Sequence, residues 1–276
     1  MAETAGLVIG AVSLTTVFTT CVDCFEYVQL GRNFGKDYQR ALLKLDIAKL
    51  RLSRWADAAD ESRNQYRVTV GTTAEAEKVK EILGEIVAYF ADAEKVSQRF
   101  KTKSNSTELQ VYDVNTDLEP NLRTMHDKMR DLALKRQRRS TVHQKTAWAL
   151  YEKKHFDRLI SDVVELVDGL VQLFPATQKR QSELVIEDVQ ELESQPALPE
   201  IEAAAEDVDS LLASSVQRAL ATQGSHNFTR NTATDEADAQ YGDQYARGAQ
   251  HTGPGHSYDG NTASGKAKAQ YGNRYL

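Results

Sequence analysis

The sequence predicts an all-α fold, a helical bundle with one small β-hairpin, followed by a tail of different character. Three observations lead to this prediction. Apolar side chains recur every three or four residues through most of residues 36–222, which is the spacing of amphipathic helices. Residues 223–276 hold one leucine and neither isoleucine nor valine. Two blocks within them, 226–245 and 256–275, repeat each other at an offset of 30.

Length, charge and cysteine content indicate the domain organisation, the partners and the cellular setting of the chain. The 276 residues suffice for one helical domain, residues 1–222, and a tail, residues 223–276. The net charge is −6, and because the tail carries five basic and five acidic side chains, the excess lies in the helical part. An acidic chain does not favour a nucleic-acid partner. Two cysteines, Cys21 and Cys24, fit a reducing, cytoplasmic setting, and we interpret them as core thiols.

The chain begins with an uncharged run of 19 residues, 4–22. As a helix it would be about 28 Å long, close to the thickness of a bilayer's hydrocarbon core. It does not resemble a signal peptide, because Glu3 precedes it and the first basic residue is Arg32. Two interpretations stay open: a buried first helix of the bundle, or a helix that protein and lipid can each bury. The second assigns membrane insertion to Gly6, Leu7, Val8, Ile9, Leu14, Val17 and Phe18.

Four apolar stripes predict the main helices. The sets at helical spacing are Tyr38, Leu42, Leu45, Leu52, Trp55 and Ala59; Val79, Leu83, Ile86, Phe90, Ala93 and Phe100; Leu122, Met125, Met129 and Leu132 after Pro120; and Phe156, Ile160, Val163, Val167, Leu170 and Phe174, ended by Pro175. Two acidic amphipathic segments follow, at about 177–193 and 200–222. Residues 108–113 favour a hairpin strand, and residues 146–151 favour a buried turn of helix.

The helical part shows no pattern typical of an enzyme. No nucleophile elbow, phosphate-binding glycine loop or paired-carboxylate motif occurs, and the six histidines form no metal pattern. We therefore predict no catalytic, cofactor or metal site. The basic cluster at residues 135–139 is interpreted as a solvated helix end, with contact to anionic lipid headgroups as the alternative.

The two blocks of the tail are identical at ten of 20 aligned positions and alternate in character with the period of a strand. One face carries small, amide and tyrosine side chains, and each block carries Tyr-Gly near its end. The predicted inward positions are Asn231, Ala233, Ala237, Ala239, Tyr241 and Gly242, and Asn261, Ala263, Ala267, Ala269, Tyr271 and Gly272. Stacked asparagines favour cross-β assembly. A duplicated flexible tail is the alternative interpretation.

Charges support stacking of the blocks as successive rungs. Glu236 aligns with Lys266, and Asp238 aligns with Lys268, so opposite charges would lie above one another about 4.8 Å apart. The tail is thus predicted to be disordered as a monomer and ordered once it is stacked.

These blocks resemble the prion-forming repeats of the fungal HET-s/HET-S family and related amyloid signalling motifs. The helical part resembles the HeLo domain of that family, most densely at residues 21–38, 45–55 and 145–151, and the two resemblances together cover essentially the whole chain. They imply a helical bundle with a small hairpin and a tail that forms a two-rung β-solenoid when it becomes amyloid.

The resemblance also implies a function. An amyloid template would order the tail, the resting bundle would be lost, and the first helix would enter the plasma membrane and cause cell death. The role would lie in heterokaryon incompatibility or in signalling from a nucleotide-binding receptor that carries a similar repeat. The implied partners are further copies of the chain, such a receptor and, on activation, membrane lipids. The alternative is a soluble, non-toxic prion or interaction protein that uses only its repeats.

Overall fold

The computed structural model describes residues 14–66, 73–105, 107–137, 147–192, 195–223, 227–234, 239–240, 257–266 and 269–270. The chain divides into two units, Met1–Val216 and Gln217–Leu276. This division lies inside the last helix, α9 (Ser210–Gln223), whereas composition places the boundary at the end of that helix.

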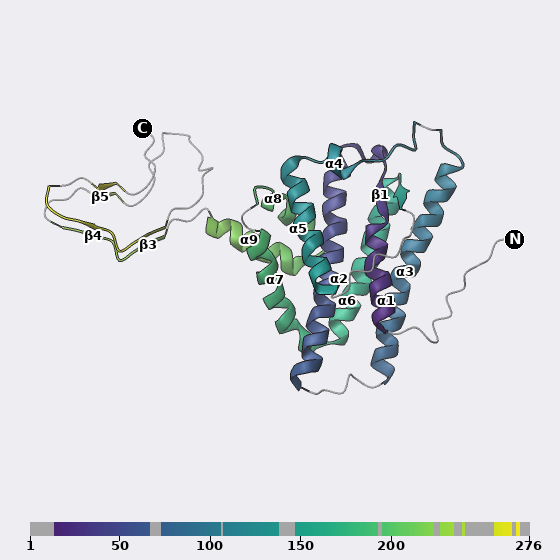
Figure 1. Ribbon diagram of the computed structural model, residues 1–276, viewed down its shortest axis with the longest axis horizontal. Helices are drawn as coiled ribbons and strands as arrows, with labels where there is room; N and C mark the ends of the chain where they lie inside the picture. Colours follow the sequence, from purple (N-terminus) through teal and green to yellow (C-terminus); the bar gives the residue numbers. More distant parts are fainter. Residues whose placement is uncertain are drawn as a thin grey trace. The chain divides into compact units, whose positions relative to one another are not determined.

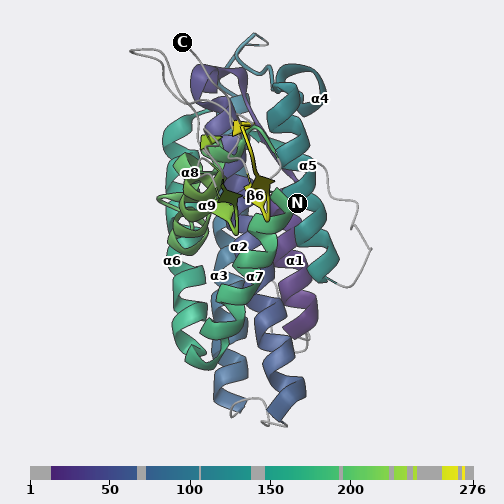
Figure 2. The same cartoon turned by 90° about the vertical axis from the view of Figure 1, so that its left-hand side faces the viewer.

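The first unit is a bundle built around three long helices. These are α2 (Tyr38–Tyr66), α3 (Thr73–Lys101) and α6 (Lys153–Leu173). Helices α1 (Leu14–Glu26) and α5 (Pro120–Gln137) run beside them, with α1 against α3 and α5 against α2 (Figures 1 and 2). The predicted stripes form the core: Leu42, Leu52, Trp55, Leu83, Ile86, Phe90, Met125, Phe156, Val163 and Leu170 are all buried. The four predicted main helices are therefore confirmed.

Shorter elements complete the bundle. They are two 3₁₀ segments (Arg32–Asp37 and Pro175–Thr177), α4 (Val114–Asp117), α7 (Gln178–Leu192) and α8 (Leu198–Ala205). The predicted segment 200–222 is two helices, α8 and α9, because the chain breaks between them. Asp209 ends the break: its Oδ1 accepts a hydrogen bond from the Leu212 amide at 3.1 Å, which caps the start of α9.

The predicted hairpin is wrong. Strand β1 (Val28–Leu30) pairs in parallel with β2 (Trp148–Leu150), which lies far away in the sequence and was predicted to be helical. All three residues of β2 are buried, and a short apolar run without alternation does not distinguish a buried strand from a helix. Of residues 108–113, only Val111 makes a bridge, to Gly31. Gly31 is required here, since a Cβ atom would lie 2.6 Å from Tyr151 Cδ1.

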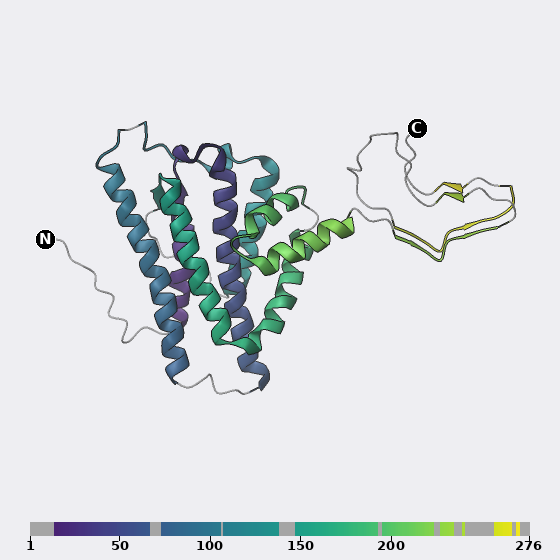
Figure 3. The same cartoon turned by 180° about the vertical axis from the view of Figure 1, so that it is seen from behind.

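The described residues of the second unit form three parallel strand pairs. Strand β3 (Asn227–Thr229) pairs with β6 (Ser257–Asp259), β4 (Thr232–Ala233) with β7 (Thr262–Ala263), and β5 (Ala239–Gln240) with β8 (Ala269–Gln270). Every pair joins residues 30 apart, such as Thr232 and Thr262, so the block alignment gives the register (Figure 3). Gly260 and Gly265 have φ values of 68° and 74°, in the region that favours glycine.

Candidate functional site: the first helix, the buried charges and the paired blocks

The described part of the first helix is a core element. Val17, Cys21, Val22 and Phe25 of α1 are buried, and the Phe25 ring meets Phe90 of α3 edge-on at a centroid distance of 4.7 Å. Of the predicted insertion residues, Val17 is buried, and Leu14 and Phe18 are partly buried. The other four, Gly6, Leu7, Val8 and Ile9, lie outside the described residues. This packing agrees with the buried-helix interpretation of the resting protein.

Further observations concern the cysteines of α1 and the described residues as a whole. Cys21 and Cys24 are buried free thiols, as predicted, and burial raises the pKa of Cys21 well above its ordinary value. No helix within the described ranges is long and apolar enough to span a membrane. Those ranges also hold no group of three or more His, Cys, Asp and Glu side chains placed to bind a metal ion.

The end of α1 is tied to α2 and α5 by charge. The Glu26 carboxylate pairs with Lys49 of α2, and it accepts a hydrogen bond from Arg130 Nε of α5 at 3.1 Å. Burial alone would raise the pKa of Glu26, but Lys49 and Arg130 outweigh burial and lower it. Beside them, His126 Nδ1 lies 2.8 Å from Asp46 Oδ2. Burial opposes a charged His126, yet the Asp46 carboxylate prevails and raises the pKa of His126.

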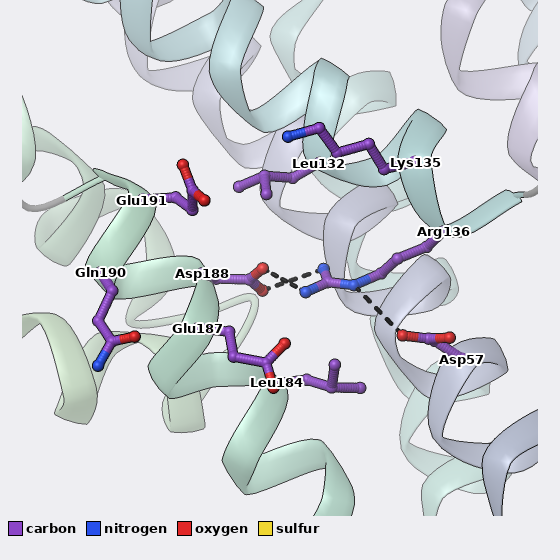
Figure 4. A pocket seen from close by; sticks show the side chains of 9 residues that line it. All are labelled: Asp57, Leu132, Lys135, Arg136, Leu184, Glu187, Asp188, Gln190 and Glu191. Carbon is purple, nitrogen blue, oxygen red and sulfur yellow. Dashed lines mark hydrogen bonds and ion pairs between the residues drawn. The ribbon is translucent and has the colours of Figure 1, made fainter.

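A second charge network lies inside the bundle. Arg136 of α5 forms a bidentate pair with Asp188 of α7 and lies 3.9 Å from Asp57 of α2 (Figure 4). These side chains border a surface hollow of about 670 Å³ between α5 and α7. The Arg136 side chain is only 9% exposed, so it is neither a solvated helix end nor available to lipid. The interpretation of residues 135–139 is corrected for Arg136, while Lys135 is exposed and residues 138–139 lie outside the described residues.

Asp188 has a second cationic neighbour, Arg54 of α2. Arg54 Nε lies 3.3 Å from Asp188 Oδ2, and Arg54 Nη2 donates to Asp209, which precedes α9. Burial raises the pKa of Asp188 even beside Arg54 and Arg136. Sequence reasoning missed these charges, although a signal was present. Arg54 interrupts a helical stripe of fully buried residues, Ile47, Leu50 and Ala58.

The described tail residues alternate as the sequence predicts. Ala263 is buried, Asn231 and Asn261 are partly buried, and Thr232, Thr262, Lys266 and Gln270 are exposed. Asn231 Oδ1 accepts a hydrogen bond from the Asn261 amide at 2.9 Å, so this asparagine joins the two blocks. Ala233 pairs with Ala263, and Ala239 with Ala269. Their part in an assembled fibril stays a prediction.

Several predicted tail residues cannot be placed. Outside the described residues lie Ala237, Tyr241, Gly242, Ala267, Tyr271 and Gly272, and the charged residues Glu236, Asp238 and Lys268. The structure adds a pair that sequence reasoning missed: Arg230 Nε donates to Asp259 Oδ1 at 2.9 Å, linking the two blocks. The signal was weak, because Arg230 aligns with Gly260 and not with Asp259.

Comparison with known proteins assigns the chain to a family. The HeLo family model, described as prion-inhibition and propagation, matches residues 6–201. Heterokaryon incompatibility protein s of Podospora anserina is 35% identical over 259 residues, covering 92% of this chain and 88% of that protein. Heterokaryon incompatibility protein S of a strain of the same fungus is 32% identical over 253 residues, covering 91% and 87%.

Solved structures agree with the sequence matches. The HET-S N-terminal domain superposes with a TM-score of 0.70 at 34% identity, covering 77% of this chain and 95% of that one. A double mutant of the HET-s N-terminal domain gives a TM-score of 0.69 at 33% identity, covering 76% and 99%. The fold and these matches define a HeLo-domain protein. The chain belongs to the HET-s/HET-S family of fungal heterokaryon incompatibility proteins.

Proposed function

We propose that this chain is a non-enzymatic cell-death effector that is switched on by amyloid assembly of its tail and then disrupts the plasma membrane. The resting protein would be cytoplasmic. The observation that carries the proposal is the parallel, in-register pairing of the two blocks at an offset of 30. A two-stranded parallel ladder has two outer edges, and each can accept the matching block of another copy. The partners are therefore further copies of this chain, or a receptor that carries a similar repeat.

Geometry supplies a reason why assembly would destabilise the bundle. Each two-rung molecule advances a fibril by only about 9.6 Å, whereas a folded domain of this size is roughly 45 Å across. Helix α9 ends at Gln223 and strand β3 begins at Asn227, so little chain separates them. Folded bundles cannot all be seated beside one fibril at this spacing. A stability of about 5–15 kcal/mol can be lost to such crowding. Helix α1 would then lose the α3 surface that buries it.

A second function is a soluble, non-toxic prion or interaction protein, with assembly of the tail as its whole activity. The packing of α1 favours it, because the described part of this helix buries Cys21 and Val22 against the bundle.

Dye release from vesicles of anionic phospholipid separates the two functions. The full chain is mixed with preformed fibrils of residues 223–276, and both release and fibril growth are followed. The effector function predicts release only after seeding. Fibril growth without release would favour the non-toxic function, and absence of growth would contradict both. Ala263→Asp places a charge on the buried face of β7 and should abolish growth and release. Thr262→Asp, one residue away on the exposed face, is the matched control.

A further inference from the structure

Four basic side chains of α2 hold the segment that joins α8 to α9. Arg40 Nη2 donates to the Ala203 carbonyl at 2.9 Å, and Lys44 Nζ donates to Asp207 at 2.9 Å. Arg51 Nη1 donates to the Val208 carbonyl at 2.8 Å, and Arg54 pairs with Asp209. We call these contacts the junction clamp. They run along one side of α2 and attach Ala203 near the end of α8 and residues 207–209, which lead into α9, all just beyond the residues that the family model matches.

The strongest contact of the clamp is the one between Arg54 and Asp209. Both side chains are 2% exposed, so both charges are removed from water. The Asp209 carboxylate has two tasks, since one oxygen caps α9 at Leu212 and the other accepts from Arg54. The alternative acceptor for Arg54 is Asp188, which Arg136 already engages through both of its oxygens.

Withdrawal of Asp209 would therefore take from Arg54 the carboxylate that accepts its hydrogen bond and leave it to share Asp188 with Arg136. Removing one partner of a buried pair is far more costly than removing both, because the remaining charge has lost its hydration and its partner. The start of α9 cannot move away from α2 without disturbing the centre of the bundle. The same α9 leads, within three residues of its end, into β3.

We propose that the junction clamp is the autoinhibitory contact that transmits tail assembly to the bundle, with Arg54 and Asp209 as its positioning residues. Tension or steric crowding at α9 separates Asp209 from Arg54, and the guanidinium, which then shares Asp188 with Arg136, opens the packing of α2. This inference rests on the proposed amyloid-triggered function, because it names the contact through which that function would act.

The first test compares two neighbouring substitutions in the full chain without seeds. Asp209→Asn keeps an N-cap, since asparagine caps helices well, but it removes the charge that Arg54 requires. Asp207→Asn makes the same change of charge at the solvent-exposed carboxylate of the clamp, which is 69% exposed and pairs with Lys44, so it tests whether the effect belongs to the buried pair of Arg54 and Asp209. Hydrogen exchange of the amides of α2 should be about tenfold faster or more in Asp209→Asn and nearly unchanged in Asp207→Asn. Equal exchange in the two variants would overturn the clamp.

The second test separates transmission from stability. The double variant Arg54→Met with Asp209→Asn removes both partners and leaves Asp188 paired with Arg136, so exchange in α2 should return close to the wild-type rate. Helix α9 can now leave without stranding a charge. Seeded fibrils of the double variant should grow normally but release vesicle dye at least about fivefold more slowly than wild type. Release as fast as wild type would show that the pair stabilises without transmitting.

The two tests also separate the clamp from the function on which it rests. If seeded wild-type protein released no dye, the membrane-disrupting function would fail. The role of the clamp would then be tested by hydrogen exchange of the α2 amides in fibrils of the full chain. Wild-type protein should lose protection on assembly and the double variant should keep it. Retention of protection in wild-type fibrils would overturn the clamp itself.

Discussion

The bundle and the tail obtain their order from different sources. The main bundle helices bury apolar stripes against other helices of the same molecule, and the charges that enter this interior, such as Arg54 and Asp188, find partners there. In the tail, identical residues of the two blocks pair with each other: Thr232 pairs with Thr262, and Gln240 pairs with Gln270. The packing of the bundle is complete within one molecule, whereas a repeat that is stacked in parallel leaves strand edges that the next copy can extend. One chain thus carries a finite structure and an extendable one.

The two regions also differ in how much an ion pair contributes to stability. The Arg54 pair is withdrawn from water, while the Arg230 side chain that joins the tail blocks is 79% exposed. Exposed pairs contribute little individually and are screened by salt. We therefore expect substitutions in the bundle to have large effects within one molecule. A substitution in the tail should have a small effect on each molecule, but this effect should recur at every molecule of a fibril and so change its rate of growth.

The largest effect should come from a cavity in the bundle. Ile86 of α3 is fully buried, so Ile86→Ala should lower the free energy of unfolding by about 2–5 kcal/mol. Urea denaturation followed by helical circular dichroism measures this loss. Growth of fibrils on preformed seeds should not slow. Ile186→Ala is the control, because Ile186 of α7 is 50% exposed and its truncation should cost under about 0.5 kcal/mol. Equal losses in both variants would contradict the assigned core.

Next in size is charge reversal in the tail. Replacing Glu236 and Asp238 with lysine would align four lysines in each two-rung unit, so seeded elongation at low salt should slow by about tenfold. Adding Lys266→Glu and Lys268→Asp should restore the rate, because the columns again alternate. Neither protein should change in urea denaturation of the bundle. If the fourfold variant were no faster than the twofold one, the predicted charge register would be wrong.

Much of this comparison could be predicted from the sequence, for a physical reason. Helical stripes and an internal repeat are local patterns, so the main helices of the bundle and the register of the blocks follow from spacing. The β1–β2 pair could not be predicted, because its partners lie far apart and both are short. The buried charges were missed because the position of Arg54 in an apolar stripe does not show which carboxylates it meets, and Asp188 alone looks like a solvated position. Only the fold shows that their helices bring them together.

A smaller effect concerns the pH dependence of the bundle. Asp46 faces His126 from α2, with Lys49 beside it and Glu26 approaching from α1, and Asp46 raises the pKa of His126. A raised folded pKa means that His126 contributes stability fully below its unfolded pKa of about 6.5 and loses it as pH rises through the folded pKa. We expect the bundle to lose stability as the pH rises above about 6.5 and through the raised folded pKa of His126.

Urea denaturation across this range, compared between wild type and His126→Gln, measures the contribution of His126. The variant should be less stable at pH 6 and show a flatter profile above it. A profile as steep as that of wild type would contradict the assignment. The peptide 227–276 with His251→Gln and His256→Gln contains no histidine, so its elongation should not follow the same curve.

The smallest effect should come from the ion pair that joins the two blocks. Arg230 has a φ of 54°, a backbone conformation that asparagine tolerates, so Arg230→Asn removes the charge while keeping the turn. Asp259→Asn removes the other partner. Each should slow seeded elongation by about two- to fivefold at low salt, and the double variant should be no slower than either single one. High salt should abolish the difference by screening. Ser264→Asn, at an exposed neutral position of the second block, is the control. If the two single effects multiplied in the double variant, Arg230 and Asp259 would act independently, and the blocks would not be linked through this ion pair.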